Sequence, residues 1–329
     1  MNIIVLGNES KYYLAKLHES YRKGLRSFFN TKFWGEGYAE YDSSITSIID
    51  VKEILFNNEA VDLVILAECY DPRNWRRGAD YTDFDKLHSR KAIMLCDFWS
   101  ETDDYKGFKS FIREYDIDYI LSFFLYPILV WNDSEISNKL IWFPPSFDPC
   151  VFNDWKGQEV WDVGNLNAST LNYSDFYPER FKMHNVISNI CGIKYLTARH
   201  PGYGNHEPSH PLVGKNFSRI INSCKLFVTS GNMIYKNFAP KYVEIMASHT
   251  CLLAFEPLDS TRIGLIDGVN YVRIDGDNLE EKVKYYLSHD SERERIAKAG
   301  YELVIKNYSC YSLALRLFDE LEKRNDLCH

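Results

Sequence analysis

Residues 236–256 read Lys-Asn-Phe-Ala-Pro-Lys-Tyr-Val-Glu-Ile-Met-Ala-Ser-His-Thr-Cys-Leu-Leu-Ala-Phe-Glu. Pro240 suits the first position of a helix, because a backbone N–H at that position would have no partner within the helix. The apolar run Cys251–Phe255 follows at once and predicts a buried strand. A turn marked by Asp-Gly and a charged helix that closes on Ala-Gly complete the stretch, over residues 267–300. This order of helix, strand, turn and helix indicates an α/β domain.

The same alternation runs through the first half of the chain, where short apolar runs are separated by helical patterns. The expected strands are 2–6, 61–67, 91–96, 118–123 and 139–143. The expected helices are 12–28, 45–57 and 105–115. Alternation of this kind implies a parallel sheet that is covered by helices on both faces.

Near residue 144 the organisation changes. Pro144, Pro145 and Pro149 remove backbone donors and fix the backbone, so this stretch predicts a linker. The pattern then restarts, with expected strands at 160–164, 192–197, 225–229, 251–255 and 271–274. The expected helices of this half are 177–190, 216–223, 240–248, 279–288 and 291–306. We therefore expect two doubly wound, Rossmann-like domains that face each other across a cleft and meet near residue 150, with ligands at the carboxyl ends of the strands.

Composition excludes several classes of protein. The chain has 329 residues and a net charge of -8, which argues against a general nucleic-acid binder, since such proteins rely on clustered Lys and Arg. Its eight cysteines are scattered singly without a Cys-x-x-Cys pair, so they predict free thiols and no metal site. A reducing cytoplasm fits this pattern best.

No signal peptide or transmembrane segment is expected. Residues 1–7 form an apolar run without a basic segment before it, and they predict the first strand instead. The longest apolar run, Tyr119–Trp131, is shorter than the roughly 20 apolar residues that a spanning helix needs. Two uses remain open for it: a buried strand with a packing loop, or a patch that makes peripheral contact with a membrane or a lipid-linked acceptor.

Three stretches resemble one known family. They are the segment 236–306, the segment Pro-Pro-Ser-Phe-Asp-Pro-Cys-Val-Phe at 144–152, and Trp-Asp-Val-Gly-Asn-Leu-Asn-Ala at 161–168. Together they are similar to the linker and the nucleotide-sugar half of GT-B glycosyltransferases, of the group 1 and spore-protein-like families. The likeness covers about residues 140–320. It implies a donor-binding domain over 151–308 after an acceptor-side domain over 1–150, and a C-terminal helix, 309–329, that crosses back to the first domain.

The resemblance implies a cytoplasmic, metal-independent hexosyltransferase of the retaining kind. Such an enzyme moves a sugar from a nucleoside diphosphate to an acceptor, here a glycan, a lipid-linked molecule or a protein, and it needs no cofactor. Many retaining members carry two glutamates eight positions apart; Glu244 matches the second, but Lys236 occupies the position of the first. Two alternatives therefore stay open: a nucleotide-sugar epimerase of the same fold, and a degenerate sugar-nucleotide-binding or structural protein.

Glu244 is the leading candidate for donor binding. It lies within about one turn of the expected helix start, where a carboxylate can accept hydrogen bonds from a ribose diol while free N–H groups face phosphate oxygens. Lys241 lies on nearly the same helix face and adds a cation. The alternative for both is a solvated pair on a surface helix.

Further phosphate-binding candidates are Arg180, Arg199 and Lys215, because the charge of a pyrophosphate must be neutralised and the planar fork of arginine suits phosphate. The alternative for each is a surface cation. Asn167 could donate through its amide to a phosphate, or it could simply form a turn.

On the acceptor side, Asp97 follows the expected strand 91–96 and is our candidate for the general base. His88 and Glu101 are weaker candidates, and Asp97 could instead cap a helix. The nearby aromatic side chains of Tyr70, Trp75 and Trp99 could stack on sugars or only pack. The Asp-x-Asp pairs at 116–118 and 275–277 are interpreted as structural, so no metal site is expected.

Overall fold

The computed structural model describes residues 1–9, 17–57, 59–67, 81–96, 105–175, 177–202, 206–207 and 209–324. The described residues fall into two compact units. The first lies within Met1–Ser10, Arg22–Pro144 and Leu313–His329, and the second within Lys11–Tyr21 and Pro145–Ser312. Boundaries between the units therefore fall within α1 (Leu17–Phe28), between the linker residues Pro144 and Pro145, and within α12 (Cys310–Lys323).

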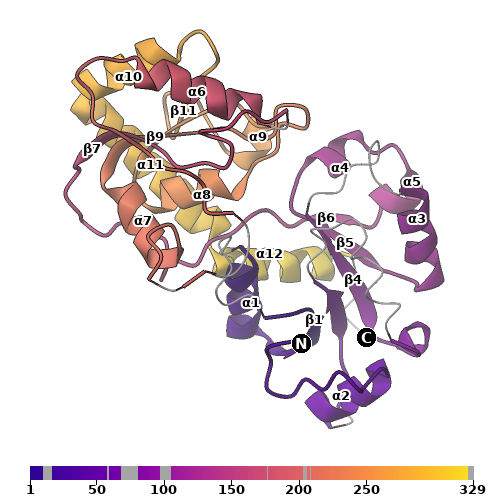
Figure 1. The fold of residues 1–329 in the computed structure, drawn as a ribbon. Helices are drawn as coiled ribbons and strands as arrows, with labels where there is room; N and C mark the ends of the chain where they lie inside the picture. The colour runs from indigo at the N-terminus through magenta and orange to yellow at the C-terminus, as the bar shows by residue number, and fades with distance from the viewer. Residues whose placement is uncertain are drawn as a thin grey trace. The chain divides into compact units, whose positions relative to one another are not determined.

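The first unit is built on a parallel sheet with the strand order β2-β1-β3-β4-β5-β6 (Figure 1). Its strands are β1 (Asn2–Leu6), β2 (Asn30–Trp34), β3 (Leu63–Leu66), β4 (Arg90–Leu95), β5 (Tyr119–Ser122) and β6 (Leu140–Trp142). The strands expected from the sequence are confirmed, and β2 is an addition. It was missed because this edge strand begins with the polar residues Asn30, Thr31 and Lys32, and so lacks a continuous apolar run.

Helices cover both faces of this sheet. The helices and the short 3-10 turn of the first unit, besides parts of α1 and α12, are α2 (Ile48–Phe56), η2 (Phe84–Lys86), α3 (Tyr105–Glu114), α4 (Tyr126–Val130) and α5 (Ser134–Ser137). Alternate strand residues such as Ile4, Val64 and Ile93 form one apolar core with α2 and α3. Figure 1 shows α1 and α12 on the other side. Arg324, just after α12, donates to the carbonyl oxygens of Asn138 at 2.7 Å and Leu140 at 2.9 Å.

The second unit holds a parallel sheet with the order β11-β10-β9-β7-β8. Its strands are β7 (Trp161–Asn165), β8 (Tyr195–Thr197), β9 (Cys224–Thr229), β10 (Cys251–Ala254) and β11 (Val272–Arg273). Its helices are α6 (Pro178–Ser188), α7 (Gly214–Asn222), α8 (Pro240–Ala247), α9 (Ser260–Ile263), α10 (Leu279–Ser288) and α11 (Asp290–Tyr308). Apolar residues of α6, α10 and α11 form one core with the strands. All the strands and helices expected here are confirmed, and α9 was missed.

The order of this second sheet creates a topological switch point. The chain places β8 on one side of β7 and β9 on the other, so the connections that follow β7 and β9 lead in opposite directions along the sheet. In doubly wound folds, ligands bind in the crevice at such a point, outside the carboxyl ends of the strands. A ligand of this unit is therefore expected beside the residues that follow Asn165 and Thr229.

The apolar run Tyr119–Trp131 divides into β5 and α4, and its Leu129 and Val130 stay exposed. Among the described residues, we find no helix with the length and apolar character needed to cross a bilayer.

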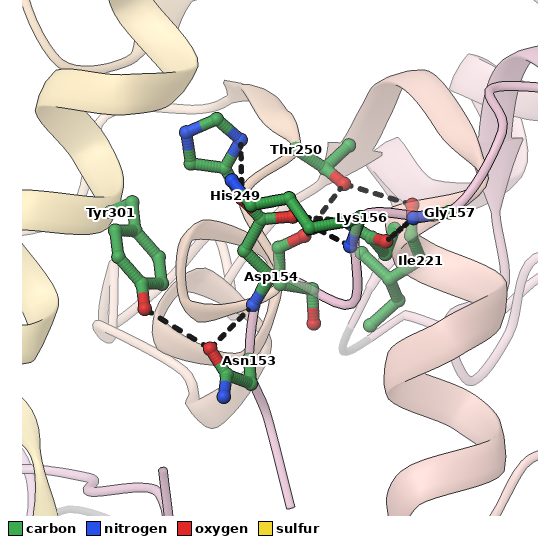
Figure 2. A network of polar contacts seen from close by, with 10 residues as sticks. Asn153, Asp154, Lys156, Gly157, Ile221, His249, Thr250 and Tyr301 are labelled. Carbon is green, nitrogen blue, oxygen red and sulfur yellow. Dashed lines mark hydrogen bonds and ion pairs between the residues drawn. The ribbon is translucent and has the colours of Figure 1, made fainter.

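The segment that leads from the linker into β7 is fixed by a polar network (Figure 2). Tyr301 donates from its hydroxyl to Asn153 Oδ1 at 3.1 Å. Asp154 binds the ammonium group of Lys156 and lies 3.7 Å from His249 Nδ1. Burial opposes ionisation of Asp154, but hydrogen bonds from Lys156 and the positive charge of His249 outweigh it, so the pKa of Asp154 is lowered.

Asn222, at the end of α7, ties this segment to the body of the unit. Its Oδ1 accepts from the Gly157 N–H at 3.1 Å, while its Nδ2 donates to the Ser248 carbonyl oxygen at 2.8 Å. Replacement of Asn222 by alanine leaves a buried carbonyl and a backbone N–H without these partners. We expect N222A to lower the free energy of unfolding by about 1 to 3 kcal/mol in urea titrations.

Asn189, the exposed C-cap of α6, provides a matched control because the one hydrogen bond of its amide among the described residues is local, to the Asn185 carbonyl oxygen. N189A should change the free energy of unfolding by less than about 0.5 kcal/mol. Equal effects of the two variants would show that the Asn222 contacts contribute nothing specific.

Candidate functional site

Beneath the switch point lies a chain of buried polar side chains. Thr229 donates from Oγ1 to Asn167 Oδ1 at 2.7 Å, and Asn167 Nδ2 donates to Asn165 Oδ1 at 2.7 Å and to the Val228 carbonyl oxygen at 2.8 Å. Thr170 adds a hydrogen bond to Asn165 Oδ1 at 3.0 Å. We call Asn165, Asn167, Thr170 and Thr229 the polar platform. Because both amide protons of Asn167 are engaged inside the protein, the expectation that this amide donates to a phosphate is corrected: Asn167 orders the loop after β7.

Arg180 joins the two loops at the switch point. It is the third residue of α6 and only 6% exposed, so the surface-cation interpretation is wrong. Its Nε and Nη2 donate to the Ser230 carbonyl oxygen at 3.1 and 2.7 Å, and its Nη1 donates to the Ala168 carbonyl oxygen at 3.3 Å. The guanidinium also lies 3.8 Å from the centre of the Tyr177 ring. One buried positive charge thus holds the loop after β7 to the loop after β9.

The loop after β9 brings polar atoms to the same place. A Cβ on Gly231 would lie 2.1 Å from the Asn237 carbonyl oxygen, so only glycine fits there. The Gly231 N–H donates to the Tyr242 hydroxyl at 3.2 Å, which fixes the loop against α8. Within the described part of the chain, Ser230 Oγ and Asn232 Nδ2 are buried polar atoms with no hydrogen-bond partner. A buried polar group without a hydrogen bond lowers the stability of the folded protein, and a bound ligand could supply the missing hydrogen bond.

Helix α8 begins at Pro240, as expected, and presents an ion pair to this region. Lys241 Nζ lies 2.9 Å from Glu244 Oε2, and Glu244 is 7% exposed, so the solvated surface pair is wrong. The ammonium group also lies 4.0 Å from the centre of the Phe217 ring, a cation–π contact. Burial lowers the pKa of Lys241; Glu244 opposes that effect, and the positive charge of Arg180 adds to it.

His200, which the sequence analysis passed over, belongs to the same neighbourhood. It follows β8, and its Nδ1 accepts from the Gly202 N–H at 3.1 Å. Burial lowers the pKa of His200 to about 4, and the charges of Lys241, Arg180 and His206 act in the same direction. A search for polar residues shortly after each expected strand would have found His200, Ser230 and Asn232.

The other candidates do not join this group by any contact described. Arg199 is exposed in the loop after β8, and Lys215 is exposed in the first turn of α7. Lys236 is exposed with a positive φ of 46°, and its carbonyl oxygen accepts from the Leu258 N–H.

On the acceptor side, Asp97 and Glu101 lie outside the described residues, as do Tyr70, Trp75 and Trp99. His88 is exposed just before β4, at the amino end of the strand, so its candidacy as a base at the carboxyl end is corrected.

The Asp-x-Asp pairs are structural. Asp118 pairs with Arg90 at 3.0 Å, and Asp275 accepts from the backbone N–H of Asp277 and Asn278 at 3.0 and 2.9 Å. Among the residues that the structure describes, no group of His, Cys, Asp and Glu side chains could hold a metal ion. What the switch point of the second unit does offer is a concentration of positive charge with unsatisfied polar atoms, an arrangement that suits an anionic ligand rich in oxygen.

The Lys241–Glu244 pair allows a direct test of this description. Replacement of Lys241 by methionine leaves a buried carboxylate without its cation, so we expect K241M to lower the free energy of unfolding by about 2 to 3 kcal/mol. The double variant K241M/E244Q should lose less free energy of unfolding than the two single variants lose together, because the two side chains act on each other.

Lys182 gives the matched control, since it pairs with Glu179 at the same spacing but is 60% exposed. K182M should change the free energy of unfolding by about 0.5 kcal/mol or less. Additive effects of K241M and E244Q in chemical denaturation would contradict a buried pair.

Comparisons with known proteins bear on this arrangement. Residues 180–319 match the model of a family described as glycosyl transferase-like. Comparison with curated protein sequences gives no match. Among solved structures, HepE from Anabaena, determined in complex with UDP-glucose, is similar at a TM-score of 0.67 and 8% identity, over 98% of this chain and 100% of that chain.

Two more solved structures extend over almost the whole chain. A glycosyltransferase from Rickettsia africae has a TM-score of 0.61 and 12% identity, over 100% of this chain and 99% of that chain. Sucrose-phosphate synthase from Thermosynechococcus elongatus has a TM-score of 0.59 and 8% identity, over 99% of both chains. At such low identity the likeness establishes the fold. The resemblance to GT-B glycosyltransferases is therefore confirmed, by the family match over residues 180–319 and by a fold shared along nearly the entire chain.

Proposed function

We propose that this protein is a glycosyltransferase that binds a nucleoside diphosphate sugar at the switch point of its second unit and transfers the sugar to an acceptor hydroxyl. The observation that carries the proposal is that Ser230 Oγ and Asn232 Nδ2 are buried without a hydrogen-bond partner among the described residues, in the loop whose Ser230 carbonyl oxygen accepts from Arg180. The positive charge of Arg180 acts in turn on Lys241. A pyrophosphate and a sugar together supply the negative charge and the many oxygen atoms that this region lacks.

Glu244 binds the ribose in this proposal. Lys241 engages Oε2 and so holds the carboxylate in place, and Oε1 accepts a hydrogen bond from a ribose hydroxyl. A carboxylate fixed in this way need not be ordered when the nucleotide binds, which reduces the entropic cost of binding.

Arg180 and Lys241 supply the field that stabilises the leaving diphosphate. Negative charge develops on the diphosphate as the bond to the sugar breaks, and fixed positive charges in a partly buried site stabilise that charge strongly. Arg180 contributes mainly through its charge and through the loops it holds, since it donates to the carbonyl oxygens of Ala168 and Ser230. The exposed cations Arg199 and Lys215 remain proposals as outer contacts.

The remaining parts of the proposal come from the family resemblance. They comprise a hexose donor, a metal-independent retaining reaction, Asp97 as the acceptor-side base, and a glycan, lipid-linked or protein acceptor. UDP-glucose is the first donor to try, because HepE was determined with this molecule.

The experiment is calorimetric titration of the protein with UDP-glucose, and with a panel of other nucleoside diphosphate sugars. We expect binding, and we expect E244Q to weaken it by about 1.5 to 3 kcal/mol, the range for a hydrogen bond to a charged group. Transfer is then followed as release of the nucleoside diphosphate in the presence of candidate acceptors.

Glu280 is the control, because it is an exposed glutamate on α10 that pairs only with its helix neighbour Lys284 among the described contacts. E280Q should bind the donor as the wild type does. An E244Q variant with unchanged affinity for the donor would remove Glu244 from the site. If the wild type bound no nucleoside diphosphate sugar of the panel, the alternative of a degenerate protein would be favoured.

A further inference from the structure

Asn232 lies in the loop after β9, and its neighbours in that loop tie it to α6 and α8. Two residues before it, the Ser230 carbonyl oxygen accepts from Arg180 Nη2 at 2.7 Å. The backbone N–H of Asn232 donates to Asn237 Oδ1, three residues before α8 begins. Asn232 is 2% exposed, but the loop reaches the surface at Ile234, which is 69% exposed. These contacts place Asn232 at the switch point, close to the carbonyl oxygen that holds Arg180 and to the start of α8.

The side-chain amide of Asn232 has a defined orientation. Its Oδ1 accepts from the backbone N–H groups of Ile234 at 2.8 Å and Tyr235 at 3.2 Å. The reversed orientation would set an NH₂ group against these two donors, so the other end of the amide is Nδ2, which can only donate. Nδ2 is buried and has no hydrogen-bond partner among the described residues. A buried donor is normally satisfied, so this one indicates that an acceptor oxygen binds here.

Arg180 brings positive charge to this loop, but its hydrogen bonds go to the protein itself. Each of its three guanidinium nitrogens donates to a backbone carbonyl oxygen, two of them to Ser230. An anionic oxygen that is attracted by this charge still needs hydrogen-bond donors. Asn232 Nδ2 is such a donor in the same loop, and a hydrogen bond to an ionised acceptor is stronger than one to a neutral acceptor.

We propose that Asn232 donates from Nδ2 to a diphosphate oxygen of the bound nucleotide sugar, while Arg180 stabilises the same anion through its charge. This role rests on the function proposed above and adds a specific contact to it. The diphosphate gains a hydrogen bond, and the buried amide gains the acceptor that it lacks within the described protein. Charge and hydrogen bonding are thus supplied by two different side chains.

Two variants of Asn232 separate this role from support of the loop. Aspartate has the same shape and still accepts from the Ile234 and Tyr235 N–H groups, but it replaces the two N–H donors with a negatively charged oxygen. Serine also keeps an acceptor for the turn, and it removes the donors without adding charge. In calorimetric titrations, N232S should bind UDP about 10- to 100-fold more weakly than the wild type, and N232D should bind it more weakly still.

Parallel titrations with UDP and UDP-glucose locate the contact. Both ligands carry the two phosphates, so a diphosphate contact predicts the same fold-loss for both in each variant. A loss of affinity for UDP-glucose without a loss for UDP would assign Nδ2 to the sugar and overturn the diphosphate role. Wild-type affinity of N232S and N232D for both ligands would mean that Asn232 only supports the loop, and would overturn it too.

Asn270 provides a matched control, because its amide is also buried and fixed but both its ends are satisfied. Its Oδ1 accepts from the Ile266 N–H at 2.9 Å, and its Nδ2 donates to the Gly264 carbonyl oxygen at 2.8 Å. N270D should keep the affinity for UDP within about twofold and lower the urea midpoint, since it removes a donor that is in use. N232D should lower that midpoint less, because its donor has no partner among the described residues.

A fall of the urea midpoint in N232D as large as in N270D would show that Nδ2 is already satisfied within the protein, and would overturn the role of Asn232. If the wild type binds UDP and UDP-glucose but the Asn232 variants bind them equally well, only this role fails. Failure of the wild type to bind any nucleoside diphosphate sugar of the panel would instead overturn the proposed function, and the role of Asn232 with it.

Discussion

The arrangement of the second unit depends on one guanidinium. Arg180 donates to carbonyl oxygens on both sides of the switch point, Ala168 after β7 and Ser230 after β9. Parallel strands give these loops a common edge but do not fix the distance between them, so a side chain must do so. This buried charge also contributes to the electrostatics: burial is the main cause of the lowered pKa values of Lys241 and His200, and the positive charge of Arg180 adds to both shifts.

Much of the fold could be predicted from the sequence, because buried parallel strands are continuous apolar runs and end at residues of a different kind. Asn2–Leu6 and Cys251–Ala254 follow this rule and were found. Strand β2 was missed since it begins with three polar residues and only its last two, Phe33 and Trp34, are apolar. Helix α9 was missed because a helix of one turn leaves no periodicity to detect.

The candidate site could be predicted only in part. The helix start at Pro240 and the spacing of Lys241 and Glu244 follow from local rules, and the structure brings the two side chains together. The environment of Asn167 and Arg180 depends on contacts with residues about 50 to 60 positions away, such as Val228 and Ser230, and no local pattern reports these. The phosphate-binding role predicted for Arg180 therefore remains a proposal, and the fold already uses its Nε, Nη1 and Nη2 as donors to backbone carbonyl oxygens.

The polar platform has a consequence for how this protein can change over time. Hydrogen bonds join Asn165, Asn167 and Thr229, which are buried together. Loss of any one of these side chains therefore leaves a buried donor or acceptor without a hydrogen-bond partner. Drift at one of these positions is therefore selected against unless a second position changes with it. The four residues of the polar platform are therefore expected to be retained or replaced together.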